Sequence, residues 1–161
     1  MQVSVDFYSI KENKKLVKMC EKLAYTHHIN NGGTLVFRGL VQGGLSDYLI
    51  CAFDKFNELV GFLSLADNMC DMNDLYVMQI VVSKKHLNQG IASKMIDYAV
   101  KCSKGYDCLT ADVSKGNIAS NALLVSKGFK KDERDLNNFY FLDLNKIENR
   151  EKIKEKVLAK R

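Results

Sequence analysis

The sequence has 161 residues, of which 47% are hydrophobic and 27% charged, a balance that suits one globular domain with a full core. This composition excludes a chain that is disordered throughout, and no apolar run approaches the ~20 residues of a membrane helix. The N-terminal segment lacks the basic start and apolar block of a secretory signal, so we expect a cytoplasmic protein with no membrane partner.

The net charge of +5 is concentrated at the C-terminal end of the chain. Residues 145–161 hold seven basic and three acidic side chains and carry +4 of it. The nearly neutral remainder does not favour a nucleic-acid partner. We expect a charged helix over residues 145–161, packed on or extending from a domain formed by residues 1–144. Its narrow apolar stripe leaves a homodimer open.

The first third of the chain predicts a strand and a helix. Residues 2–9 alternate in polarity, as a strand does. Ser9 and Glu12 have the spacing of a capping box, so the sequence predicts a helix from about residue 10 to residue 28, ended by the run Asn30–Gly33. Residues 34–46 mix strand-like and glycine-rich stretches and receive no assignment.

The remainder of the chain alternates strands and helices. We expect a hairpin from residues 48–54 and 59–67, a strand at 75–82 and a helix at about 89–102. A strand at 108–113 follows, then a short helix that Asn117 caps and Gly128 ends. Strands at 129–132 and 139–144 complete the pattern, which predicts a single α+β domain.

The turn between the strand at 75–82 and the next helix has the chemistry of a phosphate cradle. The first N–H groups of a helix have no internal partners, and the helix dipole adds positive charge there. Gly90 leaves the backbone open to a ligand, and Lys84 and Lys85 add positive charge. Alternatively, the glycine serves only the strand-to-helix connection.

Two segments resemble a known family. Val82–Ala92 is similar to the acyl-CoA-binding motif of the GNAT superfamily of N-acyltransferases. That motif has a valine, a few variable positions and then [Arg/Gln]-x-x-Gly-x-[Gly/Ala], and Gly90 and Ala92 fall on its small positions. Asn117–Phe129 resembles the family's Asn…Ala…Leu-Tyr…Gly-Phe element. The resemblance implies one GNAT-like domain, with a central, mostly antiparallel twisted sheet of six or seven strands flanked by helices.

The resemblance also implies a reaction, in which a primary amine attacks the thioester of acetyl-CoA directly. The amine would belong to a small molecule or a peptide. No metal is implied, and the five cysteines and three histidines lack metal-ligand spacing. The positions that the resemblance assigns to the cofactor are Ile80, Val81, Val82, Leu87, Asn88, Gln89, Gly90, Ile91, Ala92, Ser93, Asn117 and Leu124.

The catalytic groups are harder to place. The family often sets a carboxylate near the start of the strand at 75–82, which makes Asp74 the candidate base, and Tyr76 could orient a water. A carboxylate that is merely solvated is the alternative for Asp74. Leu124 stands where many members have the tyrosine that protonates the thiolate, so Tyr140 becomes the candidate acid.

The departures from the family pattern keep other functions open. Leu87 stands where arginine or glutamine is usual, and Asn88 where a glycine often lies. Together with Leu124 they leave open a catalytically weak module that binds or senses CoA. The basic tail leaves open an acyltransferase that associates with RNA.

Overall fold

The computed structural model describes residues 2–31, 46–147, 155 and 158–159. The unassigned segment 34–46, except for Ser46, and most of the charged helix expected at 145–161 lie outside these residues. The α+β prediction is confirmed, and the elements in chain order are β1 (Ser4–Ser9), α1 (Lys14–Asn31), β2 (Tyr48–Phe53), β3 (Leu59–Asp67), β4 (Asp74–Val82), the 3-10 turn η2 (Lys84–His86), α2 (Ile91–Cys102), β5 (Cys108–Ser114), α3 (Ile118–Ser126), β6 (Lys130–Glu133) and β7 (Asn137–Asp143).

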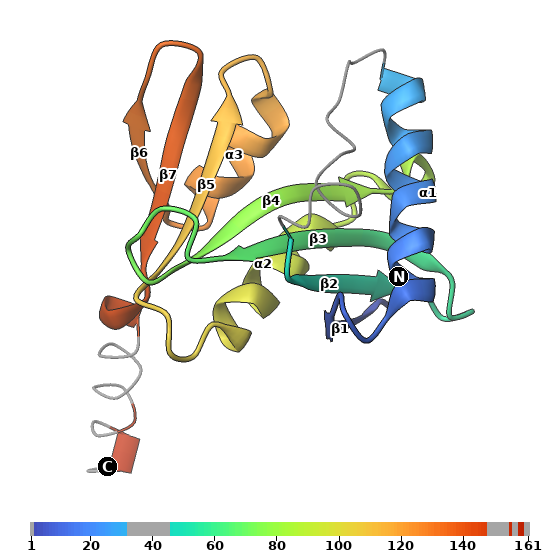
Figure 1. Ribbon diagram of the computed structural model, residues 1–161, viewed down its shortest axis with the longest axis horizontal. Coiled ribbons are helices and arrows are strands. Elements are labelled where there is room, and N and C mark those ends of the chain that lie inside the picture. The colour runs from blue at the N-terminus through green and yellow to red at the C-terminus, as the bar shows by residue number, and fades with distance from the viewer. Residues whose placement is uncertain (1, 32–45, 148–154, 156–157, 160–161) are drawn as a thin grey trace.

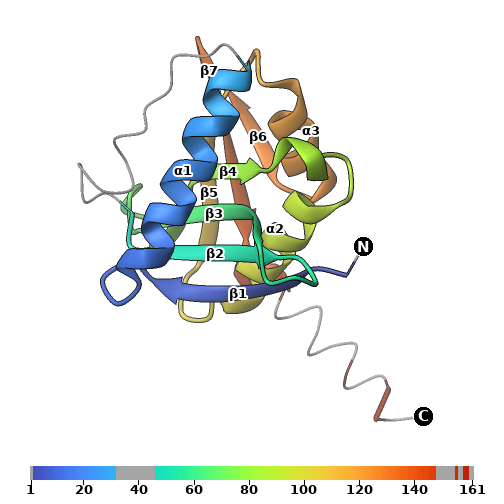
Figure 2. The same ribbon diagram turned by 90° about the vertical axis from the view of Figure 1, so that its right-hand side faces the viewer.

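The strands form one seven-stranded sheet in the order β1-β2-β3-β4-β5-β7-β6. All neighbouring strands are antiparallel except β4 and β5, which are parallel. Helix α1 covers one face of the sheet, and α2 and α3 lie on the other (Figures 1 and 2). The sheet is therefore the middle of three layers.

A hydrophobic core fills each side of the sheet. The larger cluster lies on the α2 side and includes Leu63, Val77, Met95, Ile96 and Leu109. The smaller cluster lies under α1 and includes Val17, Cys20, Leu49, Phe62 and Val81. Apolar residues on both faces explain why β3 and β4 read as nearly continuous hydrophobic runs.

Strand β4 contains a bulge at Met78. The consecutive residues Ser64 and Leu65 of β3 pair with Gln79 and Val77, so Met78 has no partner in the β3 ladder. A bulge shifts the alternation of a strand by one residue and increases its twist. Val77 therefore faces the α2 side before the bulge, and Val81 faces α1 after it.

The sheet divides between β4 and β5. Their parallel pairing is limited to three residue pairs, which begin with Asp74 and Cys108 and end with Tyr76 and Thr110. Beyond Tyr76 the two strands diverge, so that β1–β4 and β5–β7 form the arms of a V (Figure 1). This divergence opens a space in the centre of the molecule.

One predicted helix start is wrong, and two other helix ends are confirmed. Helix α1 begins at Lys14, because Ser9 is held in the β1 ladder opposite Tyr48 and cannot cap a helix. The Val17 N–H donates to the Asn13 carbonyl in the first helical bond. Asn117 caps α3 as predicted, with its side chain accepting from the Ser120 N–H.

Gly128 ends α3 as predicted, in a left-handed conformation with φ of +84°. The Gly128 and Phe129 N–H groups donate to the carbonyls of Val125 and Leu124, which is the Schellman arrangement. Phe129 and Leu124 are both buried in the core. This end therefore fixes the last turn of α3 against the sheet.

Candidate acyl-transfer cleft

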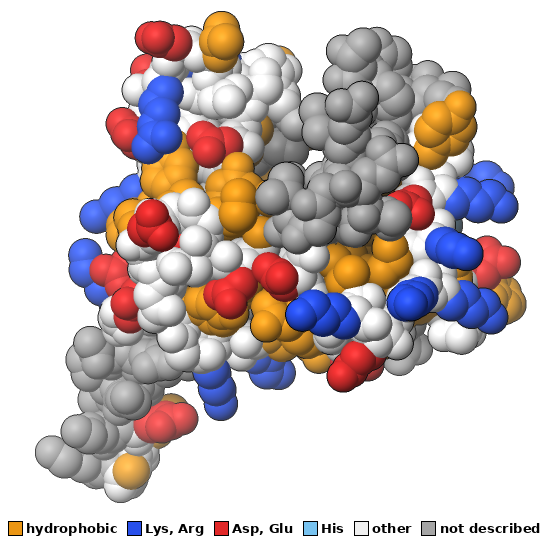
Figure 3. Space-filling view, viewed as in Figure 1, with side chains coloured by type: hydrophobic (Ala, Val, Ile, Leu, Met, Phe, Trp, Pro, Cys, Tyr) orange, Lys and Arg blue, Asp and Glu red, His pale blue; other side chains and the backbone are white. Residues whose placement is uncertain are grey.

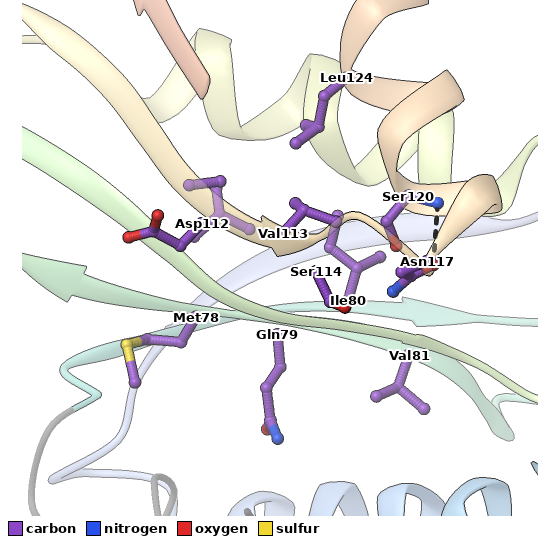
Figure 4. A pocket seen from close by; sticks show the side chains of 12 residues that line it. Met78, Gln79, Ile80, Val81, Asp112, Val113, Ser114, Asn117, Ser120 and Leu124 are labelled. Carbon is purple, nitrogen blue, oxygen red and sulfur yellow. Dashed lines mark hydrogen bonds between the residues drawn. The ribbon is translucent and has the colours of Figure 1, made fainter. Parts of the chain in front are cut away.

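A cleft of about 280 Å³ occupies the space between the diverging strands. One wall is β4 from Val77 to Val81, the other is β5 from Ala111 to Ser114, and α3 closes one side with Asn117, Ser120 and Leu124. In Figure 4, Leu124 and Ser120 extend from α3 toward the strands, and Gln79 points to the opposite side of β4. The cleft therefore passes between the two arms of the sheet.

A carboxylate and a tyrosine meet where the two strands separate. The Tyr76 hydroxyl donates to Asp112 Oδ2 over 3.4 Å. Burial, more than the neighbouring charge of Asp112, raises the pKa of Tyr76 to about 12. Tyr76 is thus a protonated donor at neutral pH, while Asp112 is exposed and lines the cleft.

Asp74 lies outside the residues that line the cleft. It is completely buried, and its carboxyl group accepts from the Thr110 hydroxyl at 2.7 Å and from the Cys70 N–H at 3.0 Å. These contacts join the loop before β4 to the parallel pairing of β4 and β5. A catalytic role for Asp74 stays a prediction, and its visible contacts are structural.

Tyr140 is also buried and is absent from the cleft lining. Its hydroxyl donates to Asn121 Oδ1 at 2.6 Å, and Asn138 Nδ2 donates to the same oxygen at 2.9 Å. The Asn121 amide donates in turn to the Ser114 carbonyl. Tyr140 thus belongs to a network that fastens α3 to β5 and β7, and its role as an acid stays a prediction.

The turn from β4 to α2 has the geometry of an anion cradle. Gly90 stands before α2 with φ of +75° and provides no side-chain cap to the free N–H groups of the first helical turn. A Cβ added at Gly90 would meet no atom within 4 Å, so the space beside this backbone is open. Asn88 is also left-handed, with φ of +59°, a conformation that asparagine adopts more easily than most residues.

The structure brings part of the predicted site together and adds to it. Ile80, Val81, Asn117 and Leu124 line the cleft, whereas the residues from Val82 to Ser93 form the end of β4, the turn and the start of α2. Sequence reasoning missed several residues that line the cleft. These are Val77, Met78, Gln79, Ala111, Asp112, Val113, Ser114 and Ser120.

One missed residue had a usable signal in the sequence. Asp112 is the single charged side chain in the strand CLTADVS, between Ala111 and Val113, which an alternating strand buries on the opposite face. Its partner Tyr76 lies 36 residues earlier, so the pair emerges only from the fold.

A comparison with models of protein families shows the family to which this chain belongs. Residues 34–129 match the model of the acetyltransferase (GNAT) family. The chain belongs to the GNAT acetyltransferase family. This membership confirms the enzyme class and the use of acetyl-CoA expected from the sequence. A search of curated proteins finds no significant match.

Solved structures of other GNAT proteins have the same fold. A GNAT acetyltransferase from Staphylococcus aureus aligns with a TM-score of 0.73 at 15% identity, over 89% of this chain and 99% of that one. The PaiA N-acetyltransferase of Thermoplasma acidophilum, solved with coenzyme A, aligns with a TM-score of 0.66 at 16% identity over the same shares.

A third similar structure is the spermidine/spermine N-acetyltransferase SpeG of Vibrio cholerae. It aligns with a TM-score of 0.63 at 15% identity, over 93% of this chain and 98% of that one. Within the described residues of the present protein, no group of three or more potential ligands is placed to hold a metal ion. No helix among these residues is both long and apolar enough to span a membrane.

Proposed function

We propose that this GNAT acetyltransferase transfers the acetyl group of acetyl-CoA to a primary amine by direct attack of the amine in the cleft between β4 and β5. The observation that carries the proposal is the divergence of these strands after only three residue pairs. Within the part of the chain that the structure describes, β4 pairs with β5 only from Asp74 to Tyr76, and the two strands separate beyond this point. The pantetheine arm would occupy the edge of β4 beyond Tyr76, with its amides pairing as an added strand does.

The two ends of the acetyl-CoA molecule have separate supports in the proposal. The pyrophosphate would lie at the open backbone beside Gly90 and accept from the first N–H groups of α2. The thioester would lie near the bulge at Met78, where the register with β3 shifts, and a backbone N–H of β4 would stabilise the developing oxyanion there. Leu87 supplies no charge to the pyrophosphate, so backbone groups carry most of the binding.

We assign the removal of the amine proton to Asp112. An alkyl amine has a pKa of ~10.4 and needs a base at neutral pH. Asp112 is accessible from the cleft, and its bond from Tyr76 holds one carboxylate oxygen in place. Since Asp74 is enclosed, Asp112 is the better placed carboxylate of the two.

We place the acceptor among small-molecule or peptide amines. One similar structure is named a spermidine/spermine N-acetyltransferase and another the ribosomal-protein-S18-alanine N-acetyltransferase of Escherichia coli, and both acceptor kinds suit an open cleft. We also propose a cytoplasmic location. All five cysteines are free thiols, as is usual in a reducing compartment.

The test combines binding and turnover. Calorimetry with CoA and thiol release from acetyl-CoA with a panel of polyamines, amino acids and peptides should show binding together with turnover of at least one amine. Replacing Asp112→Asn should lower kcat/KM about 100-fold, as the loss of a general base does. Asp132→Asn, which removes an exposed carboxylate two strands away, should leave it unchanged.

Three outcomes separate the alternatives. A chain that does not bind CoA would refute the proposal. CoA binding without thiol release for any amine would favour the alternative function, a module that binds or senses CoA. Leu124, which has no proton to donate, lies in the cleft wall and is consistent with that alternative. Full activity of Asp112→Asn would refute only the assignment of the base.

A further inference from the structure

The leaving group of the proposed reaction is a thiolate, and apolar side chains form part of the cleft that would receive it. Side chains of Val77, Ile80, Val113 and Leu124 contribute to the lining. An anion that forms beside such groups loses hydration unless a donor replaces the water. A hydrogen-bond donor within the cleft would therefore lower the barrier to cleavage of the C–S bond.

Ser120 is the hydroxyl donor that helix α3 places in the cleft wall. It lies one helical turn before Leu124, on the same face of α3, and both residues line the cleft (Figure 4). Its backbone N–H donates to Asn117 Oδ1 over 3.2 Å, which fixes the first turn of the helix. No hydrogen bond joins the Ser120 hydroxyl to another described residue, and this oxygen is not enclosed.

The position of Ser120 in the helix favours an anion as well. It is the third residue after the cap Asn117, within the first turn of a nine-residue helix. The dipole of α3 is positive at this end and stabilises negative charge close to it. A thiol near a helix N-terminus has a lowered pKa for the same reason.

The polar side chains of Tyr140 and Asn121, which lie beside this wall, have partners already. The Tyr140 hydroxyl donates to Asn121, and the Asn121 amide group donates to the carbonyls of Ser114 and Asn117. Leu124 has no proton to donate. Ser120 is therefore the hydroxyl on α3 that is both accessible from the cleft and free to bind a ligand.

We propose that the Ser120 hydroxyl donates a hydrogen bond to the sulfur of CoA as the thiolate leaves, an assignment that rests on the proposed acetyl transfer. The amine nitrogen forms the new bond to the carbonyl carbon, and the C–S bond breaks with its electron pair passing to sulfur. The proton of the attacking nitrogen passes to Asp112. Ser120 keeps its own proton, and the released thiolate takes one from solvent.

The experiment titrates the thiol of bound CoA and needs no acceptor. Thiolate absorbance of the CoA complex is followed against pH, with the desulfo-CoA complex as reference so that the protein's cysteines cancel. We expect the bound thiol of the unaltered protein to have a pKa below its ordinary ~8.5. Ser120→Ala should raise this pKa by about 1, and Ser120→Thr, which keeps the hydroxyl, should restore it.

Controls separate this role from simple binding. Ser126→Ala removes a hydroxyl from the same helix, bonded there to the Leu123 carbonyl, and should leave the thiol pKa unchanged. Equal affinity of Ser120→Ala and the unaltered protein for desulfo-CoA shows that the fold is intact. An equal loss of affinity for CoA and desulfo-CoA with no change in the thiol pKa would overturn the proposal, because Ser120 would then bind the pantetheine arm alone.

The same titration tests the role of Ser120 separately from the proposed acetyl transfer. CoA that binds but shows the same thiol pKa in the Ser120→Ala and unaltered proteins would overturn the role of Ser120 and leave acetyl transfer in place. Failure of the unaltered protein to bind CoA would remove both.

Discussion

At the scale of single residues, Tyr76 determines how the site responds to alkaline pH. Its pKa in the folded protein is about 12, raised first by burial and then by the charge of Asp112. Because the ordinary value is ~10, the unfolded chain loses this proton at lower pH than the folded protein does. Tyr76 therefore stabilises the fold fully below pH ~10 and loses that contribution as the pH rises toward 12.

This linkage predicts a difference between the protein and its Tyr76→Phe variant. The free energy of unfolding of the unaltered protein should fall more steeply between pH ~10 and pH 12 than that of the variant, since phenylalanine has no proton to lose. Urea unfolding at a series of pH values measures both slopes. Parallel curves across this range would show that the pKa of Tyr76 is not raised.

Residue patterns predicted the pieces of the site that lie close together in the chain. Gly90, Asn117 and Gly128 were identified because a left-handed turn and a helix cap each have a local signature. The pair of Tyr76 and Asp112 has no such signature. The two residues meet only because β4 and β5 lie parallel to each other, with a helix between them in the sequence.

At the scale of the elements, the junction of β4 and β5 depends on one buried contact. The Thr110 hydroxyl donates to the Asp74 carboxyl group within the three pairs that join the strands. Thr110→Val should lower the free energy of unfolding by about 2 kcal/mol, because it leaves a buried carboxyl oxygen without its donor. Urea unfolding measures this, and Thr26→Val, on an exposed face of α1, should change it by less than ~0.5 kcal/mol.

A double-mutant cycle shows whether the contact itself is responsible. Asp74→Ala and Thr110→Val, alone and combined, should give a coupling free energy of about 1 kcal/mol or more, as residues in one buried hydrogen bond do. Additive effects would mean that each change acts through packing instead. Additive effects would also contradict the structural role that the contacts of Asp74 indicate.

Helices and strands were predictable from the sequence where a single local pattern determined their ends. The strand predicted at 59–67 coincides with β3, because Leu59–Asp67 is flanked by turn residues on both sides. The start of α1 was not predictable from the sequence, because the capping pattern at Ser9 competes with a β-ladder that only the distant β2 provides. The bulge at Met78 has no sequence signature either, since it depends on the register with β3.

At the scale of the whole molecule, ligand binding should stabilise the fold. Acetyl-CoA at 100 times its Kd adds about 2.7 kcal/mol to the free energy of unfolding if only the folded state binds it. Gly90→Ala should lose most of this gain, because the new methyl group occupies the open space at the cradle. Thermal unfolding with and without acetyl-CoA measures the difference.

Gly128→Ala is the matched control for that experiment. It places the same side chain at a second left-handed position, with φ of +84°, but beyond the end of α3. Both variants should lose about 1 kcal/mol of stability in the absence of ligand, from backbone strain. Only Gly128→Ala should keep the full gain from acetyl-CoA, and an equal gain in both would place the pyrophosphate elsewhere.

The surface that Figure 3 shows carries exposed side chains of several kinds. Hydrophobic, acidic and basic groups lie side by side over the half of the face that β5–β7 form (Figure 3). Leu136, in the connection between β6 and β7, is 82% exposed.

The V between β4 and β5 also bears on solubility. A strand edge with unused N–H and C=O groups invites pairing with another chain, and proteins commonly cover or charge such edges. Among the described residues, β4 pairs with β5 only from Asp74 to Tyr76, and its later edge faces the interior of the V, with β5 and α3 around it. A narrow, flexible arm could enter from the end, whereas a whole strand with its neighbours could not, so the binding proposed at this edge does not require an edge that is open to aggregation.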